Sequence, residues 1–509
     1  MVPAVLLAAV YLIWSPPSAD LAAQTFRTEL FEAHGFDVWS NAWYGGIHLP
    51  GYSLLFPPLA SVIGIRLVGA ISVIAAAGLF AALVRPHYGD RARLAIWLFG
   101  LGAATNLFTG RLTFALGVAI ALGALLAVDR ERPALAALLA ALTAAASPVA
   151  GLFLALAGGV LFVTGRRRDG VVVGAAALGA TALVAFAFPT GGIEPFEANT
   201  FALISAATLI LIFLLPGAEN RLRLGAALYL VMCLALFAID TPVGGNATRL
   251  GALMAAPLLA LGAWRRRPMW LLGLALLPLL YWQWVAPVRD VADAVGEPSV
   301  KAAYYDPLLA ELESRAPAES FRVQVPPTRN RWEANYVGAR FPLARGWLRQ
   351  AESDDFDLFQ DGNLTAEEYR AWLDERGVAF VALSLDAEPD YLSEDEIELV
   401  RDGLPYLDEV WSNEDWELYE VTDPVPLSDA PLRLNETGFE LDAPDAGQFG
   451  LAVRWSPYYR VTEGDACVRE SGEWTAVDAR APGPIRVEAE FGPGGIADAL
   501  TGVTESCSD

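Results

Sequence analysis

The chain has 509 residues, of which 54% are hydrophobic, and its formal net charge at pH 7 is −24. The first 286 residues hold 12 of the 59 acidic and 17 of the 35 basic residues, a net charge of +5, so the remaining 223 residues carry −29. This division predicts a membrane-embedded part followed by a water-soluble part. The acidity of the soluble part excludes nucleic acid as a partner, because it repels phosphates.

Apolar segments predict a multi-pass α-helical membrane domain over residues 1–286. We expect about eleven spans, although several segments are shorter than the roughly 20 residues that cross hydrocarbon. The segments are 1–14, 67–84, 94–108, 112–128, 134–146, 149–164, 171–188, 200–215, 224–239, 250–264 and 269–286. The first could instead be a signal peptide, although it lacks a basic start and a small-residue cleavage site, or the true N-terminus could lie upstream.

The arginines between these segments predict an orientation in the plasma membrane. Alternate turns hold 13 of the 17 basic residues, and the positive-inside rule makes those turns cytoplasmic. The N-terminus is then cytoplasmic, and residues 287–509 are extracytoplasmic. The arginines that remain on the outer side are Arg27, Arg66, Arg111 and Arg249.

The first outer loop, residues 15–66, has two distinct parts. Residues 20–34 place apolar residues on one side of a helix and polar residues on the other, which predicts an amphipathic helix in the headgroup plane. Residues 39–59 are rich in Gly, Pro and aromatic residues, which predicts an irregular re-entrant segment with Trp and Tyr at the membrane interface.

Three further outer loops, residues 105–114, 188–201 and 240–251, concentrate the remaining polar residues of this domain. We therefore predict a polar pocket on the outer face, at membrane depth. Its expected contributors are Asn106, Arg111, Glu194, Glu197, Asp240, Asn246 and Arg249.

The soluble part is predicted to form two extracytoplasmic domains. Residues 287–425 combine helical and strand patterns, as in a small α/β domain, and residues 426–509 alternate strands and turns, as in a small β-sandwich. Cys467 and Cys507 fall in an oxidising compartment, so we expect a disulfide between them. Residues 327–347 are dense in Arg and aromatic residues and could bind an acceptor sugar through Arg329, Trp332 or Arg345, or serve the fold alone.

These features together carry a family resemblance. An acid directly outside an N-in first helix, an interfacial helix, the re-entrant "YGGIHLPGYSLLFPPL", many short helices and a soluble outer part resemble the GT-C superfamily of integral-membrane glycosyltransferases. The stretches "TGRLTFALG" and "PTRNRWEANYV" resemble uncharacterised actinobacterial multi-pass members. The resemblance implies a GT-C-like fold and transfer of a sugar from a polyprenyl-phosphate donor to an extracytoplasmic cell-wall glycan, lipid or protein.

The resemblance also implies residue roles. Asp20 takes the position of the catalytic acid in the first loop, with Asp37 as a second candidate; Asp20 could instead cap the helix that follows. Arg111 and Arg249 are candidates to hold the donor phosphate, or they could be boundary arginines that contact any lipid. His48 could contact the donor, act as a base, or simply be a polar anchor.

Cofactors and the class of protein stay open at this point. Some members of the superfamily use a divalent cation, for which Glu194 and Asp240 are candidates, but no residue spacing requires a metal. No nucleotide-binding motif occurs, which gives no support to nucleotide-driven transport. The alternative to an enzyme is a membrane protein that binds or moves an envelope lipid or polysaccharide.

Overall fold

The computed structural model describes residues 1–189, 192–264, 266–317, 319–355, 358, 359, 362 and 364–507, with 353–355 as backbone alone. Contacts within the chain divide it into two compact units. Unit 1 comprises Met1–Gln24, Gly51–Ala185 and Gly191–Val295, and unit 2 comprises Thr25–Pro50, Phe186–Thr190 and Gly296–Asp509. Part of the first outer loop therefore belongs to the unit that contains the sheets.

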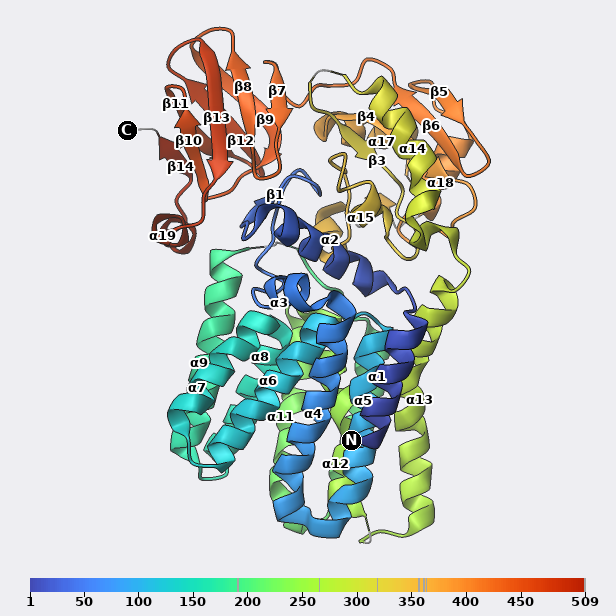
Figure 1. Ribbon diagram of the computed structural model, residues 1–509, viewed down its shortest axis with the longest axis vertical. Helices are drawn as coiled ribbons and strands as arrows, with labels where there is room; N and C mark the ends of the chain where they lie inside the picture. Colours follow the sequence, from blue (N-terminus) through green and yellow to red (C-terminus); the bar gives the residue numbers. More distant parts are fainter. Residues whose placement is uncertain are drawn as a thin grey trace. The chain divides into compact units, whose positions relative to one another are not determined.

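Unit 1 is helical, and each of the eleven predicted apolar segments coincides with a helix (Figure 1). The helices that lie in or mostly in unit 1 are α1 (Val2–Trp14), α3 (Phe56–Ile63), α4 (Ile65–Tyr88), α5 (Ala92–Phe108), α6 (Leu112–Asp129), α7 (Pro133–Ala146), α8 (Pro148–Val163), α9 (Arg167–Ala187), α10 (Ala198–Leu214), α11 (Asn220–Ala238), α12 (Thr248–Ala263) and α13 (Met269–Ala294). Short 3-10 helices η1 (Gly89–Arg91), η2 (Gly217–Glu219) and η3 (Gly244–Ala247) lie between them. The predicted amphipathic helix is α2 (Ala19–His34), which begins in unit 1 and continues into unit 2.

Helix length contradicts the predicted number of about eleven membrane spans. Among the described residues, five helical stretches are long and apolar enough to cross a membrane, or six if α1 and α2, which meet at a 73° bend, count as one broken span. The five are Ile65–Phe108, Leu112–Asp129, Arg167–Ala187, Gly217–Ala238 and Met269–Ala294. Helices α7, α8 and α10 are apolar but have only 14, 16 and 17 residues, fewer than the roughly 20 that hydrocarbon requires.

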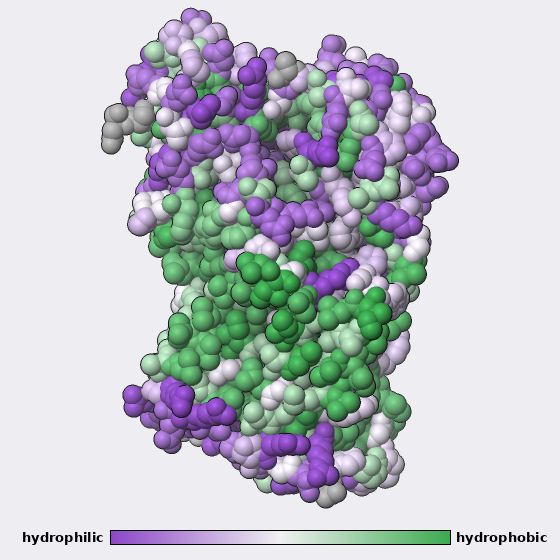
Figure 2. Space-filling view, in the orientation of Figure 1, coloured by the Kyte–Doolittle hydropathy of each residue, from purple (hydrophilic) through white to green (hydrophobic). Residues whose placement is uncertain are grey.

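Small residues let the helices of unit 1 pack closely. A methyl group on Gly69 of α4 would lie 2.8 Å from the Leu112 side chain of α6, and one on Gly158 of α8 would lie 2.8 Å from the Gly174 backbone of α9. Close backbone approach of this kind is typical of helix packing in lipid. Large apolar side chains point outward instead, among them Leu203 and Phe213 at 73% and 78% exposed, and Figure 2 shows apolar residues gathered over these helices.

The first half of unit 2 surrounds a four-stranded sheet with the order β3-β4-β6-β5. β3 and β4 are parallel, and the other pairs are antiparallel. The elements are η4 (Pro298–Val300), α14 (Ala302–Arg315), β3 (Arg322–Gln324), α15 (Glu333–Tyr336), η5 (Arg349–Asp355), α17 (Ala366–Glu375), β4 (Val378–Ser384), α18 (Glu394–Arg401), β5 (Leu407–Ser412) and β6 (Trp416–Val421). Its core packs Tyr369 and Trp372 of α17 against Val381 and Leu383 of β4.

The second half of unit 2 holds two antiparallel four-stranded sheets, with the orders β10-β13-β8-β7 and β14-β11-β12-β9. The strands are β7 (Leu432–Leu434), β8 (Gly438–Ala443), β9 (Gly447–Arg454), β10 (Tyr459–Glu463), β11 (Ala466–Ser471), β12 (Trp474–Ala479), β13 (Gly483–Ala489) and β14 (Glu505–Cys507), with helix α19 (Pro493–Thr501) before the last. Cys467 and Cys507 face each other across β11 and β14 and form a disulfide, with Cα atoms 4.1 Å apart.

The aromatic part of the first outer loop is packed inside unit 2, contrary to the prediction that its Trp and Tyr lie at a membrane interface. The two-residue strands β1 (Trp39–Ser40) and β2 (Ile47–His48) pair with each other. Trp43 is fully buried and donates its indole N–H to the Ala334 carbonyl at 2.8 Å, and Tyr44 donates its hydroxyl to the Leu348 carbonyl at 2.8 Å. These side chains bury because unit 2 satisfies their polar atoms.

Candidate functional site in the helical unit

Asp20 and Arg111 form an ion pair in unit 1. The Arg111 Nε donates to Asp20 Oδ2 at 3.2 Å, and the two side chains are 33% and 22% exposed. Asp20 lies in the first turn of α2, and Arg111 directly precedes α6. Both carboxylate and guanidinium therefore remain accessible to a ligand.

Gly110 explains how this pair is brought together. Its φ is +76°, which favours glycine. A methyl group there would lie 2.6 Å from the Leu21 backbone N and 2.6 Å from the Ser18 hydroxyl. The turn between α5 and α6 can therefore approach the start of α2 closely enough for Arg111 to reach Asp20.

Arg249, at the start of α12, supplies a second cation beside this pair. Its guanidinium lies 5.8 Å from the centre of the Phe114 ring, in a cation–π arrangement. Its Nε is buried and has no hydrogen-bond partner among the described residues. Asp20, Arg111 and Tyr52 are among its electrostatic neighbours. A buried donor of this kind is suited to an anionic group that enters the site.

An apolar cavity of about 230 Å³ adjoins Arg249 inside unit 1. Phe114, whose ring contacts the Arg249 guanidinium, lines the cavity, and so does Leu250, the residue that follows Arg249. The other walls include Leu122, Phe153, Leu211, Tyr229, Met254 and Trp282, from α6, α8, α10, α11, α12 and α13. An apolar cavity with a cation next to its lining matches an amphiphile with an anionic head.

Glu194 belongs to the same neighbourhood. It is an electrostatic neighbour of Arg249, and its backbone N–H donates to the Thr241 carbonyl at 3.0 Å. Gly244 has a φ of +35°, and a methyl group there would lie 1.7 Å from the Glu194 carbonyl oxygen. The loop before α10 thus requires a glycine at the start of η3.

Asp290 and Tyr52 are members of this group that sequence reasoning missed. Asp290 is an electrostatic neighbour of both Asp20 and Arg111. The signal was present, since Asp290 is an acid at the end of the last long apolar helix, four residues beyond the predicted segment 269–286. Tyr52 was missed because the segment around it is rich in aromatic residues, and that composition indicated only an interfacial role.

Two further predicted pocket residues, Asn106 and Asp240, belong to α5 and to the turn after α11. Asn106 is buried within α5 and donates its side-chain amide to the Ala103 carbonyl of its own helix at 3.1 Å. Asp240 is exposed just after α11.

His48 and Asp37 lie in unit 2. The His48 ring bonds the Pro189 carbonyl through Nδ1 at 2.8 Å and the Ser456 hydroxyl through Nε2 at 3.3 Å, so it is a satisfied core residue. Burial raises the pKa of Asp37; His34 opposes this rise, and Glu436 and Glu488 add to it. One Asp37 oxygen is buried without a hydrogen-bond partner among the described residues.

The buried state of His48 predicts a pH dependence of stability. Burial lowers the pKa of His48 from 6.5 to about 4, against an opposing effect of its bond to Pro189. The unfolded chain therefore binds this proton more readily than the folded chain. The contribution of neutral His48 to the free energy of unfolding should be fully present above pH 6.5. The free energy of unfolding should fall by about 3 kcal/mol as the pH drops towards 4.

Unfolding midpoints of the full chain in detergent, recorded between pH 7 and pH 4, measure this effect. His48→Asn should flatten the dependence, and the matched change of exposed His34 to Gln should leave it as in the unchanged protein. Equal slopes for the His48 variant and the unchanged protein would show that another group is responsible.

The candidates for sugar binding in residues 327–347 make contacts within unit 2. Among the described residues, the three His, Cys, Asp or Glu side chains close enough to share a cation are Cys467, Glu505 and Cys507, and the two sulfurs are bonded to each other. Arg345 is buried in a network of ion pairs, and Arg329 pairs with Glu388. Trp332 is buried and stacks on Tyr336.

No protein-family model matches this sequence, and no curated protein matches it. The functional assignment therefore depends on the residues of the site.

Proposed function

We propose that the protein is a cell-envelope glycosyltransferase that moves a sugar from a polyprenyl-phosphate donor to an extracytoplasmic acceptor. The observation that carries the proposal is the Asp20–Arg111 pair with Arg249 beside it, where Arg249 contacts Phe114 of the lining of an apolar cavity. Such a site offers a base, cations for a phosphate and an apolar space for a lipid chain. These are the groups that this transfer requires.

The reaction assigns a task to each of these residues. Asp20 accepts the proton of the acceptor hydroxyl while that oxygen attacks the anomeric carbon. The bond between this carbon and the phosphate oxygen breaks, and the polyprenyl phosphate leaves with the electron pair. Arg111 and Arg249 stabilise the negative charge that develops on the phosphate.

The ion pair also suggests an order of events. With no donor bound, Arg111 holds the Asp20 carboxylate in place at 3.2 Å. A donor phosphate competes for the guanidinium because it offers an equal negative charge and several acceptor oxygens, and it gains a second charge when the bond to the sugar breaks. Release from Arg111 then frees the Asp20 carboxylate to accept from the acceptor hydroxyl when the donor is present.

The proposed orientation places the N-terminus in the cytoplasm and residues 287–509 outside. Alternate arginine-rich turns support it through the positive-inside rule. A cysteine introduced at exposed Ser412 should react with an impermeant thiol reagent in whole cells, and one introduced at exposed Arg168 should not. The reverse pattern would contradict the orientation.

Profiling of lipid-linked saccharides and envelope glycans in a strain that lacks the gene tests the function. A transferase predicts accumulation of one polyprenyl-phosphate sugar and loss of one glycan linkage. The alternative, a non-enzymatic protein that binds or moves an envelope lipid or polysaccharide, predicts intact linkages with altered amounts or location of the polymer.

A further inference from the structure

Unit 2 contains a second cavity, of about 390 Å³, between the α/β half and the C-terminal sheets. The loop from β6 to β7 forms one wall, through Val425, Leu427 and Asp429, and the end of α17 and the strands β9 and β12 form the others. Its size falls within the usual range for small-molecule sites. Neither the predicted pocket nor the proposed reaction uses these residues.

Backbone hydrogen bonds hold the walls in place. The Ala452 N–H of β9 donates to the Leu427 carbonyl at 2.8 Å, and Ser428 forms a β-bridge with Leu451. The Trp474 ring is packed against Gly45, where a methyl group would lie 2.9 Å from it. The lining is therefore preorganised, which reduces the entropy cost of binding.

Two lining residues offer unused polar atoms. Thr475 is fully buried, and its hydroxyl oxygen has no hydrogen-bond partner among the described residues. Asp374 accepts from Arg370 Nε through Oδ2 at 2.9 Å, but its Oδ1 is buried and likewise lacks a partner within the described parts of the chain. A buried polar atom without a partner is costly, so a ligand that bonds to it gains affinity.

The remaining lining is suited to a neutral, hydroxyl-rich molecule. The hydroxyls of Ser428 and Ser471 can donate and accept, and the half-buried indole of Trp474 offers an apolar face. Glu375 accepts from Arg376 at 2.9 Å, so its charge, like that of Asp374, is already compensated. These carboxylates do not converge closely enough to form a cation site within the described structure.

We infer that this cavity binds a neutral saccharide unit. Carboxylate oxygens accept hydrogen bonds from sugar hydroxyls, the Ser and Thr hydroxyls complete the polar contacts, and Trp474 packs against the C–H face of the ring. The inference rests on the proposed function only in identifying this saccharide as part of the acceptor glycan. Binding itself requires no transfer activity and can be measured separately.

The test is calorimetry of the full chain in detergent with neutral hexose and pentose oligosaccharides. At least one should bind, and Trp474→Ala should weaken that binding about tenfold. Because Trp474 packs on Gly45, the unfolding midpoint of the variant must be checked. Asp429→Asn, at an exposed lining residue, should weaken binding several-fold without that risk, and Asp445→Asn, at an exposed residue outside the lining, should not change it.

Each other outcome has a definite meaning. The inference is overturned if no neutral oligosaccharide binds, or if Trp474→Ala and Asp429→Asn both bind as the unchanged protein does. Binding of a protonated diamine in place of neutral sugars would make this a cation site instead. Asp20→Asn should bind saccharide normally, so a failed transferase proposal and a failed saccharide site give different results.

Discussion

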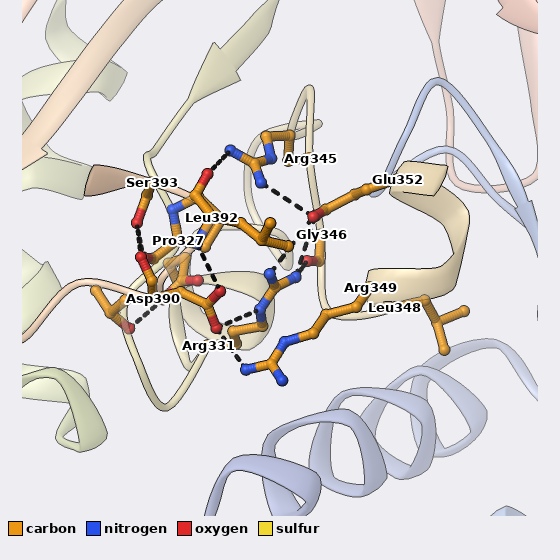
Figure 3. Close-up of polar contacts among 12 residues, drawn as sticks. Pro327, Arg331, Arg345, Gly346, Leu348, Arg349, Glu352, Asp390, Leu392 and Ser393 are labelled. Carbon is orange, nitrogen blue, oxygen red and sulfur yellow. Dashed lines mark hydrogen bonds and ion pairs between the residues drawn. The ribbon is translucent and has the colours of Figure 1, made fainter. Parts of the chain in front are cut away.

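Glu352→Gln should lower the free energy of unfolding of unit 2 by about 3–5 kcal/mol, the usual cost of removing one partner of a buried ion pair. Glu352 accepts from Arg331 Nη1 at 3.1 Å and from Arg345 Nη2 at 3.0 Å, as Figure 3 shows. All three side chains are only 2% exposed. A neutral glutamine would leave the positive charges of the two buried guanidinium groups less fully neutralised than they are now.

The neighbours of Glu352 explain why it stays ionised. Burial acts to raise the pKa of Glu352, but Arg331 and Arg345 outweigh burial and lower it. The pKa of Asp390 is likewise lowered to about 2, because Arg331 and Arg349 outweigh its burial. Both carboxylates therefore stabilise the fold above the pKa of the unfolded chain, and this stabilisation should be lost as the pH falls from about 4 towards 2.

A matched pair on the surface serves as the control. Glu313 pairs with Arg340, but these side chains are 52% and 59% exposed. Glu313→Gln should change stability by no more than about 0.5 kcal/mol, since water screens the pair. Chemical unfolding of the two variants, followed by far-UV circular dichroism, measures both effects. Similar losses for the two variants would contradict a structural role for the buried network.

The helices could be predicted from the sequence, but the number of spans could not. The eleven apolar runs coincide with helices α1 and α4 to α13, because Arg, Gly and Pro lie at the ends of those runs. Helix length depends on where a helix breaks. Ser147 and Pro148 separate α7 from α8, and Ser147 caps α8 by accepting from the Ala150 N–H at 3.4 Å. An apolar composition continues across this break, so composition alone gives no helix length.

Individual residues of the site could be predicted from the sequence, but their arrangement in space could not. Topology indicated that Asp20 and Arg111 both belong to the outer loops, but their pairing depends on the close approach at Gly110, which has no signal in the composition. Asp290 was missed because α13 continues to Ala294, beyond the end of the apolar pattern. Burial of Trp43 in unit 2 depends on a carbonyl 291 residues away, and no local pattern encodes such a contact.

Asp20→Asn should reduce sugar transfer by at least about 100-fold, the usual effect of losing a general base. Asparagine keeps the shape of the side chain, and its amide oxygen can still accept from Arg111 Nε. It cannot accept the proton of the acceptor hydroxyl. The loss should appear in kcat, with a nearly unchanged KM for the donor, because the donor phosphate is held by Arg111 and Arg249. Transfer of labelled sugar in membranes that contain each variant measures both constants.

Asp169 provides the matched control for this change. It accepts from Arg166 Nε at 2.8 Å, with side chains 29% and 32% exposed, so its pair resembles the Asp20–Arg111 pair in exposure and in its donor atom. Asp169→Asn should therefore reproduce any general effect of removing a half-exposed charge in unit 1, while full transfer activity remains. If Asp20→Asn is as active as Asp169→Asn, Asp20 only positions Arg111, and the base must be sought at Asp290 or Asp37. A loss confined to Asp20→Asn, with normal expression of both variants, requires the Asp20 carboxylate itself, because Asp169→Asn removes a comparable charge without such a loss.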